Sequence, residues 1–122
     1  MTRRPLLAVL LFAWGVAPAD VPPGQRAEVE HLLAFVTRSE CLFIRNDAAH
    51  TGAKAAAHMR KKYEYFRDRI RSTEDFIELA ASRSTTSGKP YTVRCGAQPG
   101  VATRDWLEAE LGRHRRTRRA AP

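Results

Sequence analysis

The sequence predicts a small α+β domain in which about four helices pack on a two-stranded antiparallel β-ribbon. Three observations carry this prediction. Apolar residues recur at helical spacing in several segments, two short β-branched or aromatic runs lie between polar turns, and each run contains one of the two cysteines. About one hundred residues follow a predicted export signal, which is enough for a single domain with a modest core.

Residues 1–19 have the pattern of a cleavable signal peptide. Two arginines open the chain, residues 6–14 form a short apolar run, and residues 17–19 (Ala-Pro-Ala) place small side chains where a signal peptidase cleaves. The apolar run is shorter than the roughly 20 residues of a membrane-spanning helix. We therefore expect export, cleavage near Ala19–Asp20 and a periplasmic product. A lipoprotein would need a cysteine at the cleavage point, and a retained anchor or a twin-arginine signal fits less well.

Four segments have helical patterning. Residues 25–38 and 52–71 carry continuous apolar stripes, and Ser72 with Asp75 resembles a capping box that opens a third helix running through Arg83. Thr103 is expected to cap the last helix. The apolar sides of these helices comprise Val29, Leu32, Leu33, Val36, Ala56, Met59, Tyr63, Phe66, Ile70, Phe76, Leu79, Ala80, Trp106, Leu107 and Leu111.

Two short runs are expected to form the β-ribbon. Residues 41–44 (Cys-Leu-Phe-Ile) precede an Arg-Asn-Asp turn, and residues 91–95 (Tyr-Thr-Val-Arg-Cys) follow a hydroxyl-rich loop. In an oxidising compartment the pair predicts a Cys41–Cys95 disulfide, whereas two free buried thiols are the alternative.

The cysteine pair also predicts the register of the ribbon. If Cys41 lies opposite Cys95, antiparallel pairing places Phe43 opposite Val93 and Arg45 opposite Tyr91. Alternation puts these side chains on one face, apolar at one end and polar at the other.

The basic charge is concentrated at the C-terminus. The formal net charge is +8, from 21 Lys and Arg against 13 Asp and Glu. Two of those arginines belong to the signal and five to residues 113–119, so residues 20–112 keep 14 against 13 and are nearly neutral. We expect no nucleic-acid binding, because the folded part lacks a basic stripe with interleaved aromatics. Residues 113–122 are interpreted as a disordered tail, or as an electrostatic tether to an anionic membrane surface.

Known catalytic motifs are missing. The Ser-Gly-Lys sequence at 87–89 is no phosphate loop, because Arg83 replaces the first glycine and Pro90 the magnesium-binding hydroxyl. No nucleophile elbow is present. The four histidines lack metal-ligand spacing, so we predict no metal and no cofactor.

The candidate ligand site lies at the polar end of the ribbon. Two cations with amide and hydroxyl donors suit an anion such as a carboxylate, a phosphate or an acidic sugar. The residues concerned are Arg45, Asn46, Lys89 and Tyr91, with Ser84 and Ser87 nearby.

His58 supports a second hypothesis. It lies with Lys54, Lys62 and Tyr65 along one edge of the long helix, and neighbouring cations lower its pKa and keep it neutral. The first hypothesis is a non-catalytic binding or envelope accessory module that uses His58, Lys62 and the ribbon site. The alternatives are a small hydrolase or transferase using His58 with a loop serine, and a structural interaction domain.

These motifs together resemble the YfeK-like family of small exported bacterial proteins. The resemblance covers roughly residues 27–111 and departs from the family pattern at Asp47, where the family tends to have glycine. It implies a periplasmic protein and carries over no catalytic residue. The motifs are 43–46 (Phe-Ile-Arg-Asn), His58 and Lys62, 74–77 (Glu-Asp-Phe-Ile) and 87–91 (Ser-Gly-Lys-Pro-Tyr).

Overall fold

The computed structural model describes residues 20–121, so the predicted signal peptide lies outside the described residues. The chain forms four α-helices and a four-stranded sheet, an α+β architecture as predicted. In chain order the elements are α1 (Pro23–Arg38), β1 (Leu42–Arg45), β2 (Ala48–His50), α2 (Gly52–Tyr65), the 3-10 turn η1 (Arg67–Arg69), α3 (Thr73–Ala80), β3 (Thr92–Arg94), β4 (Val101–Ala102) and α4 (Thr103–Ala120).

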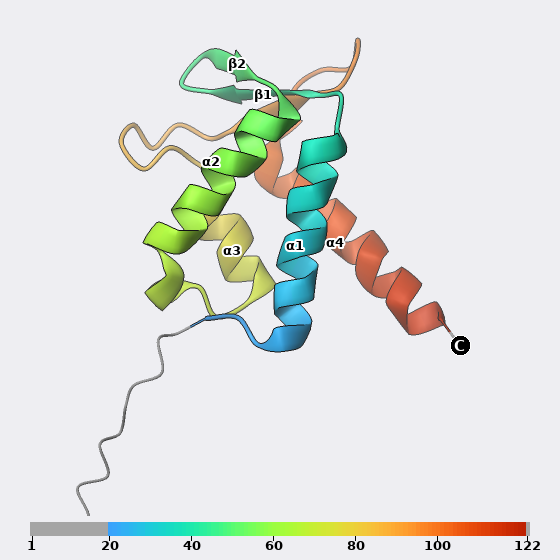
Figure 1. Ribbon diagram of the computed structural model, residues 1–122. Coiled ribbons are helices and arrows are strands. Elements are labelled where there is room, and N and C mark those ends of the chain that lie inside the picture. The colour runs from blue at the N-terminus through green and yellow to red at the C-terminus, as the bar shows by residue number, and fades with distance from the viewer. Residues whose placement is uncertain (1–19, 122) are drawn as a thin grey trace, which may run out of the picture.

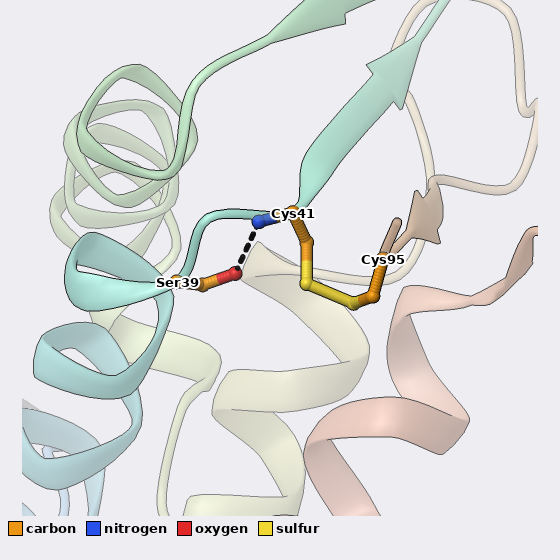
Figure 2. The surroundings of a disulfide bond; sticks show 3 residues. All are labelled: Ser39, Cys41 and Cys95. Atoms are coloured by element: carbon orange, nitrogen blue, oxygen red, sulfur yellow. Dashed lines mark hydrogen bonds between the residues drawn. A yellow bond between two sulfur atoms is a disulfide. The ribbon is translucent and has the colours of Figure 1, made fainter. Parts of the chain in front are cut away.

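The antiparallel sheet has the strand order β2-β1-β3-β4. Its two central strands are the predicted ribbon, and Phe43 pairs with Val93 in the predicted register. The disulfide between Cys41 and Cys95 joins the ends of these strands, and the Ser39 hydroxyl accepts a hydrogen bond from the Cys41 amide at 2.9 Å (Figure 2). The predicted pairing of the cysteines is therefore present.

The sheet has more strands than the predicted two-stranded ribbon, because β2 and β4 add an outer strand on each side. Asn46 and Asp47 have φ values of 49° and 67°, the left-handed pair that closes a two-residue hairpin between Arg45 and Ala48. The Ala-Ala-His sequence of β2 has no β-branched or alternating apolar pattern, and β4 has two residues. Both strands exist because β1 and β3 offer them free backbone groups.

All four helices lie on one side of the sheet, with α1 between α2 and α4 in the view (Figure 1). α1 packs against the other three helices, and the core forms between them and the sheet. Leu32, Val36, Phe76 and Leu107 are completely buried there, together with Val93 from β3. The helical faces predicted from apolar spacing thus form the core.

Several predicted helix ends are wrong by a few residues. The long helix stops at Tyr65, and η1 follows it, although Ile70 still packs in the core. Ser72 caps α3 by accepting from the Asp75 amide at 3.0 Å, as predicted, but α3 ends at Ala80 rather than Arg83.

The C-terminal segment differs most from its prediction. We expected disorder from Arg113 onward, but α4 continues to Ala120 and its Arg115 binds carboxylates of two other helices. The arginine-rich segment is helical because these contacts offset the conformational entropy that its backbone loses on ordering. None of the helices within residues 20–121 is both long and apolar enough to cross a bilayer.

Candidate functional site

The residues predicted to bind a ligand fall into two groups, and the structure separates them. The first group comprises Arg45, His58, Lys62 and Tyr91; the structure adds His50, which was not predicted, and the five residues are called the cationic cluster from here on. The second, called the loop cluster, comprises Asn46, Ser84 and Ser87. Lys89, predicted to lie beside Arg45, belongs to neither and forms an exposed ion pair with Asp47 at 3.1 Å.

The Tyr91 hydroxyl is the centre of the cationic cluster. The Lys62 ammonium donates to it at 3.2 Å, and His58 Nε2 lies 3.3 Å from it. Because the hydroxyl oxygen accepts from Lys62, its own proton is placed to donate to a neutral His58. The Tyr91 amide donates to Ser82 O at 2.9 Å, which holds the ring at the entrance to β3.

Lys62 is a buried cation that has no counter-ion among residues 20–121. Its side chain lies on α2, the residue is 8% exposed, and its ammonium donates to Arg83 O at 2.7 Å as well as to Tyr91. No carboxylate within residues 20–121 forms an ion pair with Lys62, His58 or Arg45. A buried charge is costly unless it is paired, so this arrangement is unusual.

The pKa values of the cluster record the same excess of positive charge. Burial, followed by the charges of Arg45, Lys62, His50 and Lys61, lowers the pKa of His58 to about 4. Burial, followed by the charges of Arg83 and Arg45, also lowers the pKa of Lys62. The sequence predicted a neutral His58 from its neighbouring cations, but burial is the larger cause.

Arg45 is half-buried at the end of β1, on the face that carries Phe43. Asp75 and Glu78, two carboxylates of α3, are engaged elsewhere. The Asp75 carboxylate accepts from the Arg71 amide at 3.0 Å, and Glu78 pairs with Arg83. Arg45 therefore adds a charge to the cluster that no carboxylate within residues 20–121 balances.

The loop cluster is a closed hydrogen-bond network. The Asn46 amide donates to the Ser84 hydroxyl at 3.3 Å, and the Ser87 hydroxyl donates to Asn46 Oδ1 at 2.6 Å. The Ser84 hydroxyl also accepts from the Ser87 amide at 3.2 Å. Within residues 20–121 neither serine hydrogen-bonds to His58, so the pairing that the hydrolase hypothesis needs is not formed.

Two spaces meet at His58. A small cavity of about 20 Å³ lies toward the sheet and reaches Arg45, His50 and Thr103. An open groove of about 690 Å³ also reaches His58 and runs past Lys61, Lys62, Tyr65 and Phe66. His58, Lys62 and Tyr65 were predicted to share one edge of the helix, and they share this groove.

Three residues of this region were not assigned to the site from sequence. His50 belongs to β2, which was not predicted, and Lys61 is an ordinary exposed lysine in a helix. Thr103 was predicted to cap α4, but Ala102 is the cap residue and the Thr103 hydroxyl is buried without a partner among residues 20–121. The only signal was a threonine at the start of a helix, which gives no hint of a cavity.

Comparison with known proteins places the chain in a family. A family model described as "Family of unknown function (DUF5329)" matches residues 23–115. The chain belongs to the DUF5329 family. "Uncharacterized protein YfeK" of Salmonella typhimurium is 36% identical over 86 residues, which cover 70% of this chain and 68% of that relative. No solved structure matches the chain.

The DUF5329 match contains the whole cationic cluster, the loop cluster and both cysteines. The relative agrees with the YfeK-like resemblance of the sequence motifs. Arg115, the C-terminal arginine that contacts other helices, is the last residue of the match.

Proposed function

We propose that this DUF5329 member is an exported, non-catalytic module that binds a small anionic ligand of the cell envelope at the cationic cluster. The observation that carries the proposal is the buried ammonium of Lys62, whose hydrogen bonds within the described part of the chain go only to the neutral oxygens of Arg83 and Tyr91. A ligand carboxylate or phosphate would supply the missing negative charge.

The surroundings of Lys62 favour an anion over a cation or a neutral ligand. Arg45, His50 and Arg83 all lie close enough to influence the pKa values of the cluster. A single carboxylate, Glu64, lines the open groove, against Lys61 and Lys62. The charged side chains of the groove therefore have a net positive charge. A desolvated cation such as the Lys62 ammonium interacts with an anion more strongly than a solvated cation does.

The hydrolase or transferase alternative is less well supported. It needs Ser84 or Ser87 within hydrogen-bond distance of His58. Both hydroxyls are instead engaged with Asn46, and they also accept from backbone amides, Ser84 from that of Ser87 and Ser87 from that of Lys89. Binding requires only that the cations converge, which is the arrangement around Tyr91.

Export is part of the proposal and has two supports. Residues 1–19 have the composition of a signal peptide, and the Cys41–Cys95 disulfide suits an oxidising compartment such as the periplasm.

Titration calorimetry of the mature full-length protein tests the proposed site. The probes are inorganic phosphate and galacturonate, one oxyanion and one sugar acid. Wild type should bind at least one of them, and Lys62→Met should weaken that binding at least tenfold. Lys54→Met is the matched control, because Lys54 is an exposed lysine on the same helix that lines neither the cavity nor the groove. If wild type binds neither probe, or if Lys62→Met binds like wild type, the anion site is wrong.

The exposed arginines of α4 supply a second proposed contact, with an anionic membrane surface. Arg116, Arg118 and Arg119 are exposed on the last turns of the helix and form no ion pair with other residues of 20–121. Vesicles containing phosphatidylglycerol should sediment wild type at low salt, and replacing these three arginines by glutamine should abolish sedimentation. If the triple variant sediments unchanged, α4 is no tether.

A further inference from the structure

Tyr65 is an exposed aromatic residue in the open groove of α2. The residue is 80% exposed, whereas the other aromatic side chains of residues 20–121 are buried or half-buried. A single exposed apolar side chain is ordinary on a protein surface. Tyr65, however, lines the same groove of about 690 Å³ as His58, Lys61 and Lys62. Its ring is therefore placed to contact whatever binds beside these basic residues.

Phe66 supports the ring of Tyr65. The two ring centroids are 4.8 Å apart and the ring planes are perpendicular, so the edge of one ring meets the face of the other. Both rings line the groove, and Tyr65 stays mostly open to solvent. The face of an aromatic ring is partly negative and attracts C–H groups that neighbouring oxygens polarise, as in a sugar ring.

The positive charge of the groove lies beside the same aromatic pair. The Lys62 ammonium is 5.9 Å from the centroid of the Phe66 ring, and Lys61 is an exposed second cation of the groove. No carboxylate within residues 20–121 forms an ion pair with either lysine. A ligand that has both an apolar face and an acid group would use the rings and the cations together.

The groove also contains hydrogen-bond acceptors, which a simple anion cannot use. These are the Glu64 carboxylate and the hydroxyls of Tyr65 and Thr85, and none of them hydrogen-bonds to another residue of 20–121. A sugar hydroxyl both donates and accepts hydrogen bonds, whereas a carboxylate only accepts. The mixture of acceptors, cations and aromatic rings therefore favours a saccharide over an inorganic anion or a fatty acid.

We propose that the groove of α2 binds an acidic saccharide of the uronic acid class, whose ring stacks on Tyr65 and whose carboxylate pairs with Lys61 and Lys62. This inference rests on the proposed anion site and specifies the class of its ligand. The hydroxyls of the sugar bind Glu64 and Thr85. Stacking on Tyr65 adds affinity that the cations alone do not supply.

Three probes separate the contribution of the ring from that of the charge. Titration calorimetry of the mature full-length protein compares galacturonate with acetate, which has the acid without the ring, and with galactose, which has the ring without the acid. Wild type should bind galacturonate at least tenfold more tightly than either. Protons on one face of the bound sugar ring should shift upfield in NMR spectra, because the Tyr65 ring current acts on them. Charge pairing alone does not produce that shift.

Variants of Tyr65 test its part in the site. Tyr65→Ala should bind galacturonate no more tightly than acetate and should lose the upfield shift. Tyr65→Phe keeps the ring and should restore both. Val101→Ala is the matched control, because Val101 is another exposed apolar side chain and lies on β4, outside the groove. It should bind galacturonate like wild type.

The outcomes distinguish the saccharide from the anion site itself. A wild type that binds phosphate, but binds galacturonate no more tightly than acetate, keeps the anion site and overturns the saccharide. A preference for galacturonate that survives in Tyr65→Ala places the sugar ring elsewhere and also overturns it. If wild type binds none of phosphate, acetate, galactose and galacturonate, the proposed function fails and this inference fails with it.

Discussion

The guanidinium of Arg115 on α4 binds the buried carboxylate of Glu28 on α1 through two hydrogen bonds. Nε donates to Oε2 at 2.7 Å and Nη2 donates to Oε1 at 2.9 Å, while the Thr73 hydroxyl donates to the same Oε1 at 2.7 Å. Arg115 also pairs with Glu74 at 2.6 Å, so a single side chain joins α4 to α1 and α3. These bonds lower the pKa of Glu28 to about 2 and raise the pKa of Arg115.

Truncation of the chain after Gly112 should therefore destabilise the fold. A disordered tail, as the sequence suggested for residues 113–122, could be removed at little cost, but the contacts of Arg115 make this segment part of the fold. Without Arg115 the carboxylate of Glu28 is buried with only Thr73 as a partner, which costs about 2–4 kcal/mol of unfolding free energy. Urea denaturation measures the loss. Arg115→Met should reproduce most of it, and Arg116→Met, at an exposed position, should not. A truncated protein as stable as wild type would contradict this account.

Acid should weaken the same contact in a defined pH range. The pKa of Glu28 is about 2 in the folded protein and 4.5 in the unfolded chain, so the unfolded state binds the proton more readily. The stabilisation is complete above pH 4.5 and is lost as the pH falls toward 2. A shift of this size corresponds to about 3 kcal/mol. Glu28→Gln should be less stable at neutral pH and should lose less between pH 4.5 and 2; parallel curves for the two proteins would argue against it.

Arg45→Met should leave the fold as stable as wild type or make it more stable. No carboxylate within residues 20–121 pairs with Arg45, so the substitution leaves no buried acid behind. It also removes a positive charge that lowers the pKa values of His58 and Lys62, so both pKa values should rise. The NMR titration of His58 measures the first shift, and urea denaturation measures stability. A loss of more than about 1 kcal/mol would show that Arg45 has a structural partner.

Gly52→Ala should be strongly destabilising, because α2 begins directly against the end of α1. A Cβ at this position would lie 2.1 Å from the backbone oxygen of Val36 and 3.0 Å from that of Ser39. Relieving the clash requires a shift of one helix against the other, with an expected cost of about 2–3 kcal/mol. Gly24→Ala is the control, because a Cβ there meets nothing within 4 Å, and it should be neutral or slightly stabilising. Equal stabilities for the two variants would mean that the helices separate at no cost.

Removal of the disulfide should cost about 4 kcal/mol in the loop-entropy model, since the cysteines are 54 positions apart. Replacing Cys41 and Cys95 together by serine should lower the urea midpoint accordingly, and wild type should show no alkylatable thiol. Protein from its native compartment should be two hydrogens lighter than the reduced chain by mass spectrometry. Two free thiols in that protein would show that the disulfide neither stabilises the fold nor supports export.

Much of the architecture follows from local patterns. Apolar spacing identified α1, α2 and α3, and Ser72 was correctly expected to cap α3. The pairing of Phe43 with Val93 followed from the cysteine positions, because a strand alternates with a period of two residues and a disulfide allows few registers. The edge strand β2 did not follow, since the partner strand rather than its own Ala-Ala-His sequence makes it a strand.

Local sequence patterns are enough to specify the central strand pair, the cysteine pair and the apolar helix faces, because each depends on the spacing of a few residue types along the chain. The tertiary structure decided the rest. It placed Arg115 beside Glu28, 87 positions away, and so turned an apparent polar tail into part of the fold. It also grouped Lys62 and His58 around Tyr91 and left Lys89 with Asp47. Charged side chains have no fixed period, and their energy depends on distance and burial, which only the folded packing supplies.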